Sequence, residues 1–177
     1  GTASNIGVNR VPVGTDFGYV GGDYPNGSTV DRIDYSSDTS TAAVKGPLSQ
    51  GRGYMGATGN ASYGYFGGGG VHPSPPEPKY SAVDRIDYSN DTVIALARGP
   101  LSTSTGFGAA ATGNQDFGYF GGGYADRTIV SRVDYSSDTV TALRRGDLSP
   151  SLSPAWGISA TGNQDFGYFG GGNPDVP

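Results

Sequence analysis

The stretch Asp116–Gly123, DFGYFGGG, decides the fold because close copies of it occur at three other places in the chain. It returns as DFGYFGGG at Asp165–Gly172, as DFGYVGG at Asp16–Gly22 and as SYGYFGGGG at Ser62–Gly70. A phosphate site needs one glycine-rich loop, followed by Lys-Ser/Thr or by a helix whose amides meet the phosphate. Neither feature follows these copies, so their recurrence indicates that the motif belongs to the scaffold.

Three further motifs recur in a constant order between the glycine-rich copies. A segment resembling VDRIDYSSDT occupies Val30–Thr39, Val83–Thr92 and Val130–Thr139. GPLS or GDLS occupies Gly46–Ser49, Gly99–Ser102 and Gly146–Ser149. ATGN occupies Ala57–Asn60, Ala111–Asn114 and Ala160–Asn163. The whole pattern repeats about every fifty residues, which is the period of one β-propeller blade.

Each unit reads as four short strands with no helix, so we expect an all-β fold. In the third unit the strands would cover 108–113, 117–122, 130–135 and 139–145. Along 130–135 the side chains alternate, which places Val133 and Tyr135 on one face and Arg132 and Asp134 on the other. Gly, Asn, Asp, Ser and Pro separate the strands, as turns between strands require.

The order of these motifs resembles the kelch repeat over nearly the whole chain. The FGYFGGG segments match its double-glycine strand, and the IDYSSDT segments match its strand that ends in Tyr before a turn. The tryptophan that usually follows this turn is absent, and Ala42, Ala95 and Ala142 lie near its position. The sequence motifs DRIDYS, GPLS and ATGN are also similar to repeats in tail-fibre-like structural proteins of marine cyanophages. The resemblance implies kelch-like β-propeller blades of four antiparallel strands.

The repeats predict a single repeat domain over residues 1–177. The units are approximately 1–49, 50–102 and 103–149, followed by a half-repeat over 150–177, which makes about three and a half blades. Closed propellers contain roughly four to eight blades. We therefore expect either a fragment of a larger propeller or an open or oligomeric array, and of these two we favour the fragment. The expected partners are other copies or the rest of a longer chain.

The paired glycines have an expected structural role. The first of each pair would let neighbouring strands approach closely, and the second would adopt a backbone conformation closed to other residues. The glycines concerned are Gly21, Gly22, Gly67, Gly68, Gly121, Gly122, Gly170 and Gly171.

The acidic residues suggest turns and ion pairs. Asp34 and Asp38 offer two oxygens to calcium, but the alternating acids, central glycine and distal glutamate of a calcium loop are missing. A tight turn capped by Asp and Ser explains DYSSDT better. Arg32 shares a strand face with Asp34, so a ladder of such ion pairs between blades is expected. We expect no metal and no cofactor.

An enzyme is not expected, and no catalytic residue is assigned. His72 is the only histidine, which excludes a multi-histidine centre such as the copper site of galactose oxidase, and no GxSxG is present. A carboxylate pair stays open because every blade carries acids. The net charge of −5 argues against nucleic acid, no apolar run could span a membrane, and the lack of cysteine excludes disulfides.

Comparison of the copies with one another locates a variable face. The loop between the second and third strands and the loop into the next unit differ in length, whereas the two other turns hardly vary. Both variable loops should emerge at one end of the blades, where binding residues are commonly placed. The exposed aromatic residues expected there, as contacts for a partner or glycan, are Tyr24, Tyr80, Tyr124 and Trp156. The equally weighted alternative is that these loops have no binding role and only fill space or pack on a neighbouring subunit.

Asn26, Asn60 and Asn90 fit the pattern for N-glycosylation. The expected function is a non-enzymatic structural or adhesion module of a phage tail fibre or another extracellular surface, with a surface glycan or receptor as partner. The alternatives are a carbohydrate-recognition propeller, a filament subunit and, less favoured, a propeller hydrolase or lyase with carboxylates in its central channel.

Overall fold

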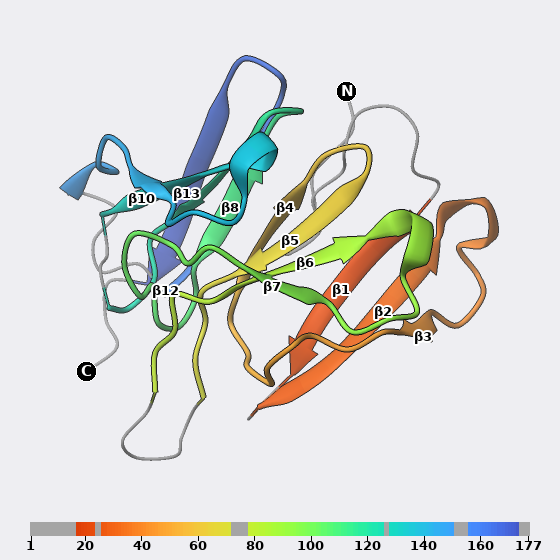
Figure 1. The fold of residues 1–177 in the computed structure, drawn as a ribbon. Coiled ribbons are helices and arrows are strands. Elements are labelled where there is room, and N and C mark those ends of the chain that lie inside the picture. The colour runs from red at the N-terminus through yellow and green to blue at the C-terminus, as the bar shows by residue number, and fades with distance from the viewer. Residues whose placement is uncertain (1–16, 24–25, 72–77, 126–127, 151–155, 174–177) are drawn as a thin grey trace.

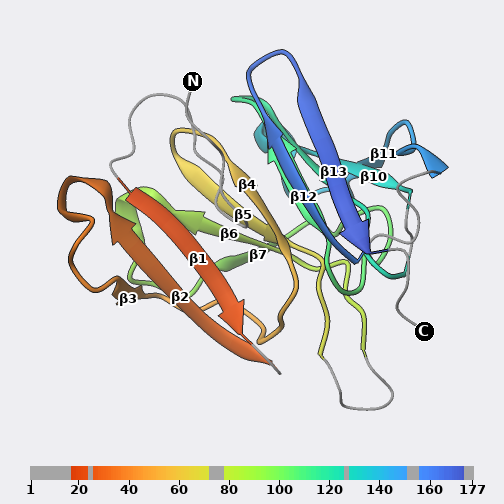
Figure 2. The ribbon, with the colours of Figure 1, turned by 180° about the vertical axis from the view of Figure 1, so that it is seen from behind.

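The structure, a computed structural model, describes residues 17–23, 26–71, 78–125, 128–150 and 156–173. In these ranges the chain forms antiparallel sheets whose strands follow one another in sequence order. The sheets stand side by side like the blades of a fan, as Figures 1 and 2 show from opposite sides. The prediction of all-β, four-stranded propeller blades is therefore confirmed.

The first blade contains β1 (Phe17–Asp23), β2 (Gly27–Asp34) and β3 (Ala43–Lys45). The second blade contains β4 (Gly56–Gly59), β5 (Tyr63–Gly67), β6 (Val83–Asp87) and β7 (Leu96–Arg98). The third blade contains β8 (Ala110–Gly113), β9 (Phe117–Gly121), β10 (Val130–Asp134) and β11 (Leu143–Arg144). The fourth sheet contains β12 (Trp156–Gly162) and β13 (Gly167–Asn173). The segment that would supply the first strand of the first blade lies outside the described residues.

The first strands of successive blades contact one another, β4 with β8 and β8 with β12. These strands therefore form the inner side of the array.

A one-turn 3-10 helix follows the third strand of each blade, where the sequence predicted a turn and no helix. These helices are η1 (Tyr35–Ser37), η2 (Tyr88–Asn90) and η3 (Tyr135–Ser137). In the first of them Asp34 accepts a hydrogen bond from the Ser36 backbone N–H at 2.9 Å and another from its hydroxyl at 2.6 Å. These hydrogen bonds hold the pKa of the Asp34 carboxyl below its usual range. The aspartate is thus engaged in a capped turn.

The fourth strand is shorter than expected, since β11 covers Leu143–Arg144 and not 139–145. The cause is the preceding blade: the Ala142 N–H donates to the carbonyl of Pro100 at 2.8 Å. Residues just before β11 therefore bond to the neighbouring blade and not within their own sheet.

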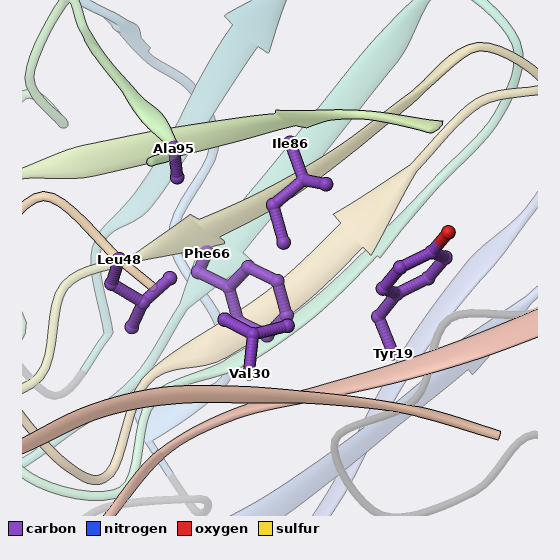
Figure 3. Close-up of a cluster of buried hydrophobic side chains, with 6 residues drawn as sticks. All are labelled: Tyr19, Val30, Leu48, Phe66, Ile86 and Ala95. Atoms are coloured by element: carbon purple, nitrogen blue, oxygen red, sulfur yellow. The ribbon is translucent and has the colours of Figure 1, made fainter. Parts of the chain in front are cut away.

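The core lies between blades and repeats position by position. The first cluster contains Tyr19, Val30, Leu48, Phe66, Ile86 and Ala95 (Figure 3). The second contains the equivalent residues Tyr65, Val83, Leu101, Phe120, Val133 and Ala142. The GPLS leucine is thus a core residue, and the alanine at the missing tryptophan position fills the same core. Burying each large apolar side chain contributes roughly 1.5–3 kcal/mol.

The two glycines of each pair have different structural roles. A β-carbon at Gly67 would lie 2.6 Å from the Phe120 ring, so the first glycine leaves room for the phenylalanine of the next blade. The second glycine has a positive φ, 74° at Gly68 and 70° at Gly122, which a side chain would strain. Gly21, Gly121, Gly22 and Gly171 repeat these roles, whereas a β-carbon at Gly170 would meet nothing within 4 Å.

The second and third blades each place one aspartate against the blade before them. Asp91 accepts hydrogen bonds from the Tyr19 hydroxyl and Arg32 Nη1, both at 2.9 Å, and Lys45 Nζ lies 3.4 Å from its second oxygen. The ladder of ion pairs between blades therefore exists, but the expected partner was wrong. Arg32 bonds to Asp91 of the next blade, because Asp34 on its own strand caps η1.

The same joint recurs between the second and third blades. Asp138 accepts from the Tyr65 hydroxyl at 2.9 Å and from Arg85 Nη1 at 2.8 Å, and Arg98 Nε lies 3.5 Å away. Beside it, the Tyr135 ring stacks on Tyr65 with centroids 4.5 Å apart, just as Tyr88 stacks on Tyr19 at 4.9 Å.

These buried tyrosines predict a loss of stability at alkaline pH. Burial raises the pKa of Tyr88 and Tyr135, and burial with a hydrogen bond to aspartate raises the pKa of Tyr19 and Tyr65. Because the fold favours the neutral phenol, its stabilisation is complete below the ordinary pKa of about 10 and is lost as the pH rises above it. Tyrosinate absorbance and circular dichroism should show these tyrosines ionising only as the sheets unfold. Ionisation of every tyrosine near pH 10 with unchanged dichroism would contradict this.

Candidate functional site

The two variable loops of each unit meet at one end of the blades. Gly53, in the loop that leads into β4, bridges to Gly70, in the loop that follows β5. Gly69 of that second loop bridges in turn to Gly106, in the loop that leads into β8. The standardised turns meet at the other end, where Asn60 Nδ2 donates to the Gln115 carbonyl at 3.4 Å. The loops that vary in length therefore contact one another, and so do the turns that hardly vary.

A buried ion pair connects the variable loops to the sheet of the second blade. Arg52 is fully buried, and its Nη1 lies 2.8 Å from Asp84 Oδ2 on β6. Its Nε donates to the carbonyl of Gly68 at 2.9 Å, and Ser49 donates to the other Asp84 oxygen. One guanidinium thus ties the loop into β4 to the loop after β5.

Tyr54 is the unusual residue of this face. It is the one non-glycine residue with positive φ, 63°, within the described part of the chain. Left-handed backbone is unfavourable for a bulky side chain and is commonly found at functional sites. The surroundings keep Tyr54 there, since its neighbour Gly53 exchanges two 3.0 Å hydrogen bonds with Gly70, and its own carbonyl accepts from Gly108 N–H at 3.2 Å. Its ring is 39% exposed.

A series of contacts links Tyr54 to other aromatic and cationic residues of these loops. The Tyr54 ring meets the buried Phe107 ring edge-on, with centroids 5.6 Å apart. Tyr124 N–H donates to the Phe107 carbonyl at 2.9 Å, which places Tyr124 beside the same residue. Lys79 Nζ lies 4.7 Å above the Tyr124 ring. We call Tyr54, Lys79, Phe107 and Tyr124 the loop patch.

The structure brings some of the predicted contact residues together. Tyr124 belongs to the loop patch, and Tyr80 is half-buried next to Lys79, with its N–H bonded to the Gly69 carbonyl at 2.9 Å. Trp156 begins β12, and nothing further is described of its side chain. Tyr24 lies outside the described residues. Tyr54 and Lys79 were not predicted from the sequence. Tyr54 lies in a loop whose length varies between the copies, so the comparison of copies could have identified it.

The glycosylation candidates lie on different parts of the surface. Asn26 and Asn90 are exposed, Asn26 just before β2 and Asn90 at the end of η2. Asn60 is half-buried, and its Oδ1 accepts from the N–H groups of Ser62 and Tyr63, both at 2.9 Å. A glycan on Asn60 would sit where its amide bonds to the next blade.

Neither a metal cluster nor an acidic channel is formed by the residues that the structure describes. They contain no group of three metal-ligating side chains. The described inner strands, β4, β8 and β12, carry no carboxylate. None of the described helices has the length and apolarity to cross a membrane.

Comparison with known proteins supports the fold. No family model and no curated protein matches the chain. The solved structure of YjhT, a kelch-like β-propeller-type protein, superposes with a TM-score of 0.69 at 12% sequence identity. The blades are kelch-like. The match covers 92% of this chain and 56% of YjhT, so the chain spans little more than half of that propeller. At this identity the likeness shows the fold alone.

Proposed function

We propose that the chain is a non-enzymatic structural and adhesion module whose loop patch binds a surface glycan. Tyr54 carries the proposal, because an exposed tyrosine is held in a strained backbone conformation with its ring against Phe107, whose carbonyl accepts a hydrogen bond from Tyr124. The scaffold below contributes rigidity through the Arg52–Asp84 ion pair. The absence of carboxylates from the described inner strands weighs against the hydrolase or lyase alternative.

The chemistry of the loop patch suits a saccharide. The apolar C–H face of a sugar ring packs against aromatic rings, and tyrosine hydroxyls and Lys79 can donate hydrogen bonds to its oxygens. The positive charge of Lys79 also favours a sugar that carries a carboxylate or another anionic group. The resemblance of the repeats to tail-fibre-like proteins supports placing this module on a virion fibre or another extracellular surface.

Substitution of Tyr54 tests the proposal. In Tyr54→Gly the backbone strain is relieved and the ring is removed, so we expect the urea midpoint to be unchanged or higher while binding is lost. The measurement is retention of the full chain on a panel of immobilised anionic and neutral polysaccharides. Tyr54→Phe should keep most of the binding, because the ring remains.

The matched control is Tyr168→Ala, which removes an exposed tyrosine on β13, away from the loop patch. It should leave retention unchanged. If the wild-type chain binds no member of the panel, or if Tyr54→Gly and Tyr168→Ala behave alike, the glycan proposal fails.

A further inference from the structure

Each joint between blades has an acceptor half and an insert half. The acceptor half comprises the tyrosine of the second strand and the arginine of the third. It also includes the basic residue at the end of the fourth strand and the glycine that follows this residue. In the first joint the acceptor residues are Tyr19, Arg32, Lys45 and Gly46. The inserted residues are Tyr88, Asp91 and Val93 from the next blade. The second joint repeats this with Tyr135, Asp138 and Val140 inserted.

A third acceptor half exists on the third blade. Its members are Tyr119, Arg132, Arg145 and Gly146, at the positions of Tyr65, Arg85, Arg98 and Gly99. The fourth sheet supplies no insert, because its described strands are β12 and β13, the equivalents of the first two strands of a blade.

The ionic part of this acceptor half lacks its carboxylate. The Arg132 guanidinium lies 4.2 Å over the Phe117 ring, as Arg85 lies 4.2 Å over the ring of Tyr63. Arg85 in addition bonds to Asp138. Within the described ranges neither Arg132 nor Arg145 forms an ion pair. Arg132 is therefore positioned by the Phe117 ring for an incoming aspartate, and the exposed Arg145 supplies a second positive charge.

The aromatic part of this acceptor half is a cavity that no side chain of the described residues fills. A cavity of about 210 Å³ is lined by Thr112, Tyr119, Gly167 and Phe169, among others. In the first joint the equivalent Tyr19, Gly64 and Phe66 line a residual void of about 20 Å³, because the Tyr88 ring occupies the space.

The second joint shows how a tyrosine would sit in this socket. The Tyr135 ring stacks on Tyr65, and its hydroxyl lies 3.3 Å from Thr58 Oγ1. Thr112 is the equivalent of Thr58, and a β-carbon at Gly167 would lie 2.6 Å from its Cγ2, just as one at Gly118 would lie 2.7 Å from Thr58 Cγ2. An incoming tyrosine therefore finds a ring to stack on, Tyr119, and a hydroxyl to bond, Thr112.

The backbone of the fourth sheet is also incomplete. β13 pairs only with β12 among the described strands, whereas β9 pairs with β8 on one side and β10 on the other. Tyr168 on β13 is 59% exposed. A β-carbon at Gly146 would meet nothing within 4 Å, whereas Gly99 lies against the Val140 carbonyl and donates its N–H to the Asp138 carbonyl at 2.8 Å. Open strand edges of this kind bind an added strand.

We infer that this end of the chain binds a β-hairpin carrying the repeat's own Asp-Tyr-Ser-x-Asp-Thr turn, which completes the fourth blade. The hairpin pairs with β13, stacks its tyrosine on Tyr119 and places its aspartate between Arg132 and Arg145. Its apolar strand residue and alanine take the places that Val133 and Ala142 occupy in the second core cluster.

The occupant is a hairpin that is not already paired with a second strand. A second copy of this chain does not offer such a hairpin, because its β2–β3 hairpin is already paired with β1. This pairing runs from Phe17 opposite Asp34 to Gly21 opposite Val30. Binding a second copy would require β1 to be displaced.

A synthetic peptide of residues 128–149, added to the full chain, tests the inference. This segment is the third blade's own hairpin, and it should bind saturably in fluorescence titrations and gain strand content on binding, since an isolated hairpin is barely structured. Asp138→Asn or Tyr135→Ala in the peptide should weaken binding about tenfold or more. The absence of saturable binding up to millimolar peptide would overturn the inference.

The substitution Gly146→Ala in the chain distinguishes an effect on peptide affinity from an effect on the stability of the fold. Among the residues that the structure describes, none lies within 4 Å of a β-carbon at this position, so the unfolding midpoint should not change. In the complex the added methyl group meets the hairpin backbone, so peptide affinity should fall about tenfold or more.

Sedimentation of the peptide-free chain is the third measurement. Self-association that Asp38→Asn abolishes would show that a second copy fills the site, and the inference would be wrong.

Discussion

Replacement of Asp138 by asparagine should lower the free energy of unfolding by about 2–4 kcal/mol. Asparagine still accepts a hydrogen bond from Tyr65, but it removes the negative charge that faces Arg85 and Arg98. Asp138 is 7% exposed and the two arginines 17% and 16%, so water compensates only in part. Urea unfolding followed by circular dichroism measures the change.

The control is Asp38→Asn, the same substitution at the same repeat position. Asp38 is exposed and forms no ion pair within the described residues, so its replacement should change the free energy of unfolding by no more than about 0.5 kcal/mol. The effect of Asp138→Asn should persist at high salt, because the pair is largely buried. Equal effects of the two substitutions would show that the joint contributes nothing beyond a surface charge.

Replacement of Gly99 by alanine should also cost about 2–4 kcal/mol. A β-carbon there would overlap the carbonyl oxygen of Val140, which is backbone and cannot rotate away as a side chain could. Relief of the clash requires the two blades to separate, and this breaks the 2.8 Å hydrogen bond from Gly99 N–H to the Asp138 carbonyl. The measurement is again the urea midpoint, here with Gly146→Ala as the matched variant.

Gly146→Ala should be within about 0.5 kcal/mol of the wild type, because a β-carbon at that position would meet nothing within 4 Å. Glycine and alanine differ in intrinsic backbone freedom by the same amount at both positions. A difference between the two variants therefore reports the contact with the next blade. If Gly99→Ala is as stable as Gly146→Ala, the blades are not in contact at this point in solution.

The strands and the variable face could be predicted because local chemistry determines them. Alternation of apolar and polar residues, glycine pairs and Asp–Ser turns act over a few residues, and all of them recur. Comparison of the copies then separated the loops that vary from the turns that do not. Tyr124 was assigned to a variable loop in this way.

The partners across the joints could not be predicted, because they depend on how blades stack. Arg32 and Asp34 are two residues apart on one strand, yet Arg32 bonds to Asp91, which lies in the next repeat. The sequence likewise contains no signal that Gly67 makes room for Phe120, or that the backbone of Tyr54 is left-handed. Each of these depends on contacts between segments that are far apart in the chain.

The placement of acceptor and insert halves on every repeat has a consequence for how such chains change in length. A duplicated repeat brings both halves of a joint with it, so the new blade matches its neighbours on both sides without further substitutions. Loss of a whole repeat leaves a matched pair behind in the same way. Gain and loss in whole units are therefore tolerated, whereas a change in one half, such as the loss of Asp91, weakens a single joint and leaves the others intact.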